Sequence, residues 1–100
     1  MNVASGSTKT VVLPNVRVSG YPLTAVGPGE YVRATIIDLS RTTISATTMT
    51  RVPGTECDWQ ASMMMPSVSG RYTIVFTVKT DDANDETELR IEVDARKVGV

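Results

Sequence analysis

The stretch Gly70–Lys79, with the sequence GRYTIVFTVK, decides the fold class of this chain. In an extended conformation one side of this stretch carries only large apolar side chains, those of Tyr72, Ile74, Phe76 and Val78. The other side carries arginine, threonine and lysine, with Val75 as the one apolar exception. Because side chains alternate along a strand with a period of two, the stretch predicts a strand with one buried and one solvated face.

Three further segments show related patterns. Tyr31–Leu39 has apolar groups on both sides near its end, which predicts a central strand. Glu56–Met65 and Glu86–Asp94 alternate more cleanly, and the second carries charges on its outward side, as sheet edges often do. The residues expected to point inward from these two segments are Cys57, Trp59, Ala61, Met63 and Met65, and then Leu89, Ile91 and Val93.

The remaining segments are less regular. Lys9–Val18 is rich in β-branched residues but contains Pro14, which cannot donate to a ladder, so we expect it at a sheet edge. Thr42–Val52 alternates weakly, which leaves its register poorly specified. Glycine and proline residues make Ser19–Glu30 a predicted loop, and Asp81–Glu86 is a predicted acidic hairpin tip.

About seven strands at spacings of roughly ten residues, separated by turn signals, predict an all-β chain that forms an antiparallel β-sandwich. Its 100 residues suffice for a single domain with one modest core. We expect a flexible N-terminal arm over residues 1–8, the sandwich domain over residues 9–94, and a short C-terminal tail over residues 95–100.

Composition argues against several functional classes. The net charge is −1, so the basic surplus expected of a nucleic-acid-binding domain is missing. The chain has no histidine and a single cysteine, Cys57, so imidazole-based catalysis, an internal disulfide and a cysteine zinc site are all excluded. No phosphate-loop glycines or recognisable catalytic carboxylates occur, and we predict a protein that is not an enzyme and has no cofactor.

Two further features bear on ligands and location. The Asp81–Glu86 segment lacks the glycine and glutamate spacing of an EF-hand, which leaves a looser calcium site and a solvated hairpin tip as alternatives. The first residues show neither a basic start nor an apolar run, so we expect no secretory signal and no membrane partner.

The spacing Gly70-x-Tyr72-x-Ile74 before an alternating strand resembles the sixth strand of immunoglobulin-like domains. In that family the glycine turns a corner and the tyrosine hydroxyl bonds to nearby backbone. Here Ile74 replaces the usual cysteine, and Val68 stands where an acidic residue is usual. The resemblance is therefore to the broad immunoglobulin-like or fibronectin-like class, and it implies that kind of sandwich.

The segment from Trp59 to Val93 also resembles such domains in the virion proteins of tailed bacteriophages. The resemblance implies a structural protein of the virion, synthesised in the host cytoplasm, that contacts capsid or tail proteins. We expect a capsid decoration or accessory protein. The alternatives are a head–tail connector or tail-tube or baseplate component that forms a homo-oligomeric ring, and an adhesin-like or carbohydrate-binding module.

No residue-level binding site follows from this resemblance, so candidate contact residues come from the chain itself. Methionine suits adaptable contact surfaces, and Met64 is expected on the face opposite its neighbours Met63 and Met65. The two termini are the other candidates. The predicted partner contacts are Met1, Asn2, Val3, Lys9, Met64, Arg96 and Lys97; no catalytic, cofactor-binding or metal-binding residue is predicted.

Overall fold

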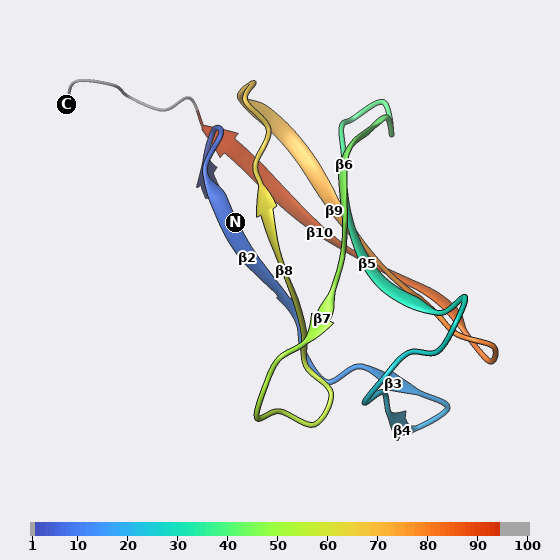
Figure 1. Ribbon diagram of the computed structural model, residues 1–100. Coiled ribbons are helices and arrows are strands. Elements are labelled where there is room, and N and C mark those ends of the chain that lie inside the picture. Colours follow the sequence, from blue (N-terminus) through green and yellow to red (C-terminus); the bar gives the residue numbers. More distant parts are fainter. Residues whose placement is uncertain (1, 95–100) are drawn as a thin grey trace.

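The computed structural model describes residues 2–94, which contain strands, turns and loops and no helix (Figure 1). None of these residues belongs to a helix that is long and apolar enough to cross a membrane. The strands are β1 (Asn2–Ala4), β2 (Thr8–Leu13), β3 (Arg17–Val18), β4 (Tyr21–Pro22), β5 (Tyr31–Ile37), β6 (Thr43–Thr48), β7 (Thr50–Arg51), β8 (Trp59–Met64), β9 (Gly70–Lys79) and β10 (Asn84–Asp94).

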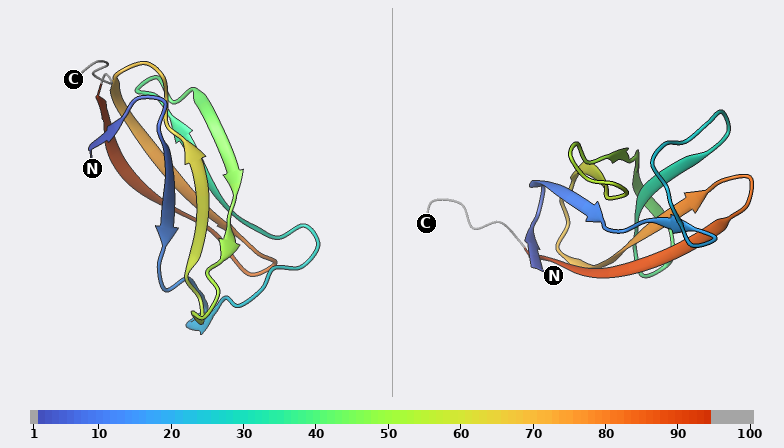
Figure 2. Two further views of the ribbon diagram at one scale, coloured as in Figure 1. Left: turned by 60° about the vertical axis from the view of Figure 1, so that its left-hand side comes forward. Right: turned by 90° about the horizontal axis from the view of Figure 1, so that it is seen from below.

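Two sheets form the body of the protein. The large sheet has the strand order β1-β10-β9-β5-β6, and the small sheet has the order β2-β8-β7. Figure 2 shows the two sheets as layers that face each other, with the β3–β4 hairpin at one end. All neighbouring strands are antiparallel except β1 and β10, which are parallel. The predicted all-β class is confirmed, and the arrangement is consistent with a β-sandwich.

The core lies between the two sheets and follows the predicted alternation. Tyr72, half-buried, packs against the cluster at the start of β9. The fully buried side chains of the inner faces include Val32, Ala34, Ile36, Ile74, Phe76, Trp59, Ala61, Met63, Ile91 and Val93. Leu89 is an exception, because it was expected inward and is 38% exposed. Every residue of β10 from Asn84 to Arg90 is exposed, which shows that this end of the strand lies beyond the cover of the small sheet.

The weak alternation of Thr42–Val52 has a structural reason. This segment leaves one sheet and enters the other: β6 pairs with β5, and β7 pairs with β8. At the switch the Met49 N–H donates to the Val32 carbonyl at 2.7 Å, and beyond it the Val52 N–H donates to the Asp58 carbonyl at 2.7 Å. A segment that pairs first with one sheet and then with the other does not keep the same face buried along its length. The alternation of apolar and polar residues is therefore weak.

Residues 2–8, part of the segment expected to form a flexible arm, contain strand β1 and the first residue of β2. Strand β1 pairs with the end of β10, with Val3 opposite Val93, and the Val3 side chain is 5% exposed. A turn then carries the chain to β2, with the Gly6 N–H donating to the Pro66 carbonyl at 3.0 Å. One buried valine and a parallel ladder hold a segment that looks polar in sequence. Residues 1 and 95–100 lie outside the described part.

Two predicted loops also contain strand. Ser19–Glu30 includes β4, which forms a tight hairpin with β3 through Ser19 and Gly20, both at positive φ. The acidic tip is shorter than Asp81–Glu86, because the Thr80 N–H donates to the Ala83 carbonyl at 2.8 Å and β10 begins at Asn84.

Candidate contact surfaces

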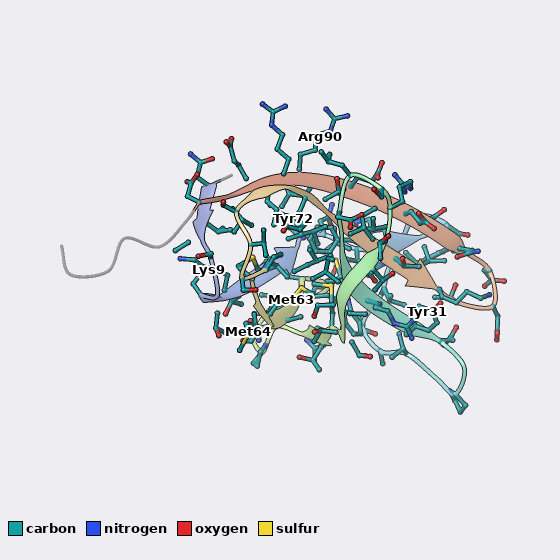
Figure 3. The ribbon with its side chains drawn as sticks, turned by 90° about the horizontal axis from the view of Figure 1, so that it is seen from above. Lys9, Tyr31, Met63, Met64, Tyr72 and Arg90 are labelled. Carbon is teal, nitrogen blue, oxygen red and sulfur yellow. The ribbon has the colours of Figure 1, made fainter. Side chains whose placement is uncertain are left out.

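Lys9 and Met64, two of the predicted contact residues, lie on the paired strands β2 and β8 but on opposite faces of the small sheet. Met64 lies opposite Thr8 in the ladder, and Lys9 lies opposite Met63. Met63 points into the core and is 1% exposed, whereas Met64 points outward and is 67% exposed. In Figure 3 the Met64 label lies on the small-sheet side of the molecule, away from Arg90 on the large sheet.

The predicted contact residues at the termini do not all lie on the surface of the described part of the chain. Asn2 is exposed on β1, next to Val3, whose side chain belongs to the core and presents no surface to a partner. Met1, Arg96 and Lys97 lie outside the described residues. The structure therefore separates Asn2, on the large sheet, from Lys9 and Met64, which lie on opposite faces of the small sheet.

The outer face of the small sheet carries no charged side chain within its three strands. Its residues alternate with the buried Val11, Ala61 and Met63, and in the ladder they lie beside one another. We call it the uncharged face, and it consists of Thr8, Thr10, Val12, Thr50, Gln60, Ser62 and Met64. Val12 at 46% exposure and Met64 at 67% are its large apolar members.

The outer face of the large sheet is the opposite in character. We call it the charged face, and its ionic residues are Arg33, Arg71, Lys79, Glu86, Glu88, Arg90, Glu92 and Asp94. Two of its apolar members are buried, Val75 at 6% and Ile37 at 7% exposure, whereas Ala46 on the edge strand β6 is exposed. Arg41, from the β5–β6 turn, reaches Glu88 on β10 with 3.4 Å between the nitrogen and the oxygen.

A hollow of about 560 Å³ lies at one end of the charged face. Three arginines line it, Arg41, Arg71 and Arg90, together with the carboxylates of Asp38 and Glu92. The Asp38 carboxylate accepts hydrogen bonds from two backbone N–H groups of its own turn, each at 2.9 Å. Cations and anions therefore nearly balance in this hollow, and it resembles a solvated ionic surface more than a selective anion site.

Glu30 joins two loops at the opposite end of the large sheet. Its carboxylate accepts hydrogen bonds from the backbone N–H of Gly27 at 2.7 Å and of Asp81 at 3.1 Å. These two bonds, the Gly27 bond first, lower the pKa of Glu30 from its usual value, and Lys79 adds a smaller effect in the same direction. The carboxylate orders the loops and is not poised as an acid catalyst.

Metal and sugar sites receive no positive support from residues 2–94. Within that range no group of three or more Asp, Glu, Cys or His side chains is arranged to hold a metal ion. Of the aromatic residues, Trp59 and Phe76 are buried, and Tyr31 stacks with Arg33, whose guanidinium carbon lies 4.0 Å from the ring centre. Tyr21 is 76% exposed on the small hairpin and does not form part of a flat aromatic platform.

Comparison with known proteins gives no identification: no family model, no curated protein and no solved structure matches this chain. The functional argument therefore depends on the surfaces described above.

The uncharged face was missed by the sequence analysis, although its signal is present in the sequence. Thr8-x-Thr10-x-Val12 and Gln60-x-Ser62-x-Met64 each lack a charge on the face that alternates with the core. Only the pairing of β2 with β8 places these two short runs side by side. The hollow could not be predicted in this way, because the residues that line it, such as Asp38, Arg71 and Arg90, come from distant parts of the chain.

Proposed function

We propose that this chain is a non-enzymatic structural protein of a bacteriophage particle, a capsid decoration or accessory protein that acts through protein–protein contact. The observation that carries the proposal is the uncharged face, centred on β2 and β8. Interface centres are depleted in charged residues and enriched in methionine, whereas a sheet face that only meets water usually carries charges. The charged face of the same molecule shows what the solvated alternative looks like.

We further propose that the sandwich is of the immunoglobulin-like class. Two observations support this finer assignment. The Tyr72 hydroxyl donates to the Val68 carbonyl at 2.8 Å, at the corner where the chain passes from the small sheet to the large one. This is the tyrosine corner expected near the start of the sixth strand of that class. In addition, the last strand β10 pairs with β9, and β9 pairs with β5, which is the G-F-C order.

Such a scaffold suits the proposed role for a physical reason. A contact surface on a sheet has an ordered backbone, because the ladder and the packed residues beneath it hold the strands in place. Under the uncharged face Trp59 is 3% exposed, and its indole N–H donates to the Leu23 carbonyl at 3.0 Å. The surface therefore needs little ordering when a partner docks on it, which favours binding.

The test is incorporation into particles. Particles collected from a lysed culture of the source by density gradient should contain the chain, detected with an antibody raised against it. A tagged Met64→Lys variant should be absent from these particles because it buries an unpaired charge at the interface. Asn84→Lys, at the exposed start of β10, is the matched control and should be incorporated normally.

The two parts of the proposal fail in different ways. A chain that never appears in particles would refute the phage role. A chain that appears in particles, with Met64→Lys incorporated as well as Asn84→Lys, would leave the role intact and refute the uncharged face as its contact surface. Both variants should melt within a few degrees of the parent protein, which shows that any loss is not a folding defect.

A further inference from the structure

We propose that two copies of this chain pair through the outer edge of β2, antiparallel, about a two-fold axis at Thr10. The pairing would join two small sheets into one continuous sheet of twice the width. This inference goes beyond the proposed function and does not depend on it, because it is argued from the backbone of β2 and from the residues that the pairing brings together.

The outer edge of β2 is free of any other described strand. In the small sheet β2 is an end strand, with β8 on its only paired side (Figure 1). The Met65 N–H donates to the Ser7 carbonyl at 2.7 Å, so the odd-numbered backbone groups of this segment point toward β8. Backbone groups alternate in direction along a strand, and those of Thr8, Thr10 and Val12 therefore point outward, where they can bond a further strand.

One register satisfies these outward groups symmetrically. With Thr10 opposite Thr10 of the partner subunit, Thr8 lies opposite Val12 of the partner subunit, and the reverse holds by symmetry. Each of these is a hydrogen-bonded pair that exchanges two bonds, which gives about six in all. The facing side chains are β-branched, which are favourable cross-strand pairs.

Charge and chain geometry are compatible with the same register. Lys9 is the only charged residue of β2, and it would face Val11 of the partner subunit, so no like charges are opposed. The paired segment ends naturally on both sides, because Gly6 would face Pro14 of the partner subunit. Gly6 turns the chain at φ 67°, and proline has no N–H to continue the ladder.

The other free edges are less suited to self-pairing. The free part of β10 has outward backbone groups at Glu86, Glu88 and Arg90, a charged edge of the kind that discourages strand addition. The edge of β6 has a register shift at Ile36/Ile37, and the chain leaves the large sheet at Met49. By contrast, β2 pairs with β8 over all six of its residues without a shift.

Cysteine cross-linking tests the register directly. Cα atoms of a hydrogen-bonded antiparallel pair are about 5.5 Å apart, within the range that a disulfide spans. Thr10→Cys should therefore form a covalent dimer under mild oxidation. Val12→Cys alone should not, because the two copies of this position lie about 13 Å apart along the strands. A mixture of Thr8→Cys and Val12→Cys proteins should cross-link to each other. Cys57 is buried and common to all variants.

Sedimentation velocity tests the edge without cross-linking. The unmodified chain should sediment as a dimer at high concentration and dissociate on dilution. Thr10→Pro removes an outward N–H, which the monomer does not use, so it should stay folded by circular dichroism and sediment as a monomer. Glu88→Pro removes an outward N–H from the β10 edge in the same way, and it should leave the dimer intact.

Three results would overturn the inference. The first is a monomer at every concentration up to the millimolar range. The second is a dimer that Glu88→Pro disrupts while Thr10→Pro leaves it unchanged. The third is equal cross-linking of Thr10→Cys and Val12→Cys, which signals random collision. The first result, together with incorporation of that monomeric chain into particles, would leave the proposed function standing.

Discussion

The outer faces of the two sheets differ although both alternate with the same core. On the large sheet, ionic side chains surround two outward apolar residues, Val75 and Ile37, which are nearly inaccessible. On the outer face of the small sheet no ionic side chain is present, and the outward Val12 and Met64 remain open to solvent. The first face already has its two large aliphatic residues covered. The second has none of its apolar groups covered, and this is why we place the partner contact there.

The largest expected effect on the free energy of unfolding is a difference between two outward valines, Val75 on the large sheet and Val12 on the small sheet. Val75→Ala should lower the free energy of unfolding by about 2 kcal/mol, because it removes two buried methyl groups. Val12→Ala, the same substitution on the uncharged face, should change it by less than about 0.5 kcal/mol. Urea unfolding of both variants measures the difference. Equal losses would mean that the two faces are covered to the same extent, and the comparison would fail.

The next effect concerns the corner that joins the two sheets. Tyr72→Phe removes the hydroxyl that donates to the Val68 carbonyl and keeps the ring against the core. We expect a loss of about 0.5–1.5 kcal/mol, the usual net value of one hydrogen bond. Tyr21→Phe is the control, since Tyr21 is 76% exposed and should be neutral. If both variants are neutral, the sheets are joined by core packing alone.

The contrast between the faces explains what the sequence could predict. A strand with one buried and one solvated face alternates apolar and polar side chains with a period of two. Gly70–Lys79 shows this alternation, and its predicted bounds are those of β9 in the structure. The edge position of Lys9–Val18 was also predicted correctly, because Pro14 excludes a central strand.

The failures have the same physical origin. Asn2–Ala4 contains a single large apolar residue, too little for a period, and its strand is fixed by pairing with β10 at the far end of the chain. Leu89 alternates correctly, but no sequence pattern shows that the small sheet ends before reaching it. Likewise, neither face could be recognised as a surface until the pairing of distant strands was known. Local patterns specify strands, and long-range pairing specifies surfaces.

A smaller effect is expected from the ion pair on the charged face. Arg41 and Glu88 are 67% and 51% exposed at their side chains, and their 3.4 Å contact is open to solvent. Arg41→Ala should cost less than about 1 kcal/mol, and the loss should shrink further at high salt, where the pair is screened. Melting at low and high ionic strength measures it. A larger, salt-independent loss would show that Arg41 stabilises the β5–β6 turn by packing instead of charge.

The smallest effect concerns the loops at the end of the large sheet that the Glu30 carboxylate joins. The folded-state pKa of Glu30 is lowered from a usual value of 4.5 by backbone bonds to Gly27 and Asp81. A carboxyl whose pKa is lowered on folding stabilises the protein above its unfolded pKa, and this contribution is lost as the pH falls through the folded pKa. Glu30→Gln should therefore be less stable than the parent at neutral pH, and the difference should shrink below about pH 4.5. The partners of Glu30 are backbone N–H groups. Salt should therefore change the stability difference between Glu30→Gln and the parent less than it changes the contribution of the Arg41–Glu88 pair. An unchanged difference between the two proteins across the acid range would show that the ionised Glu30 carboxylate does not stabilise the loops through these bonds.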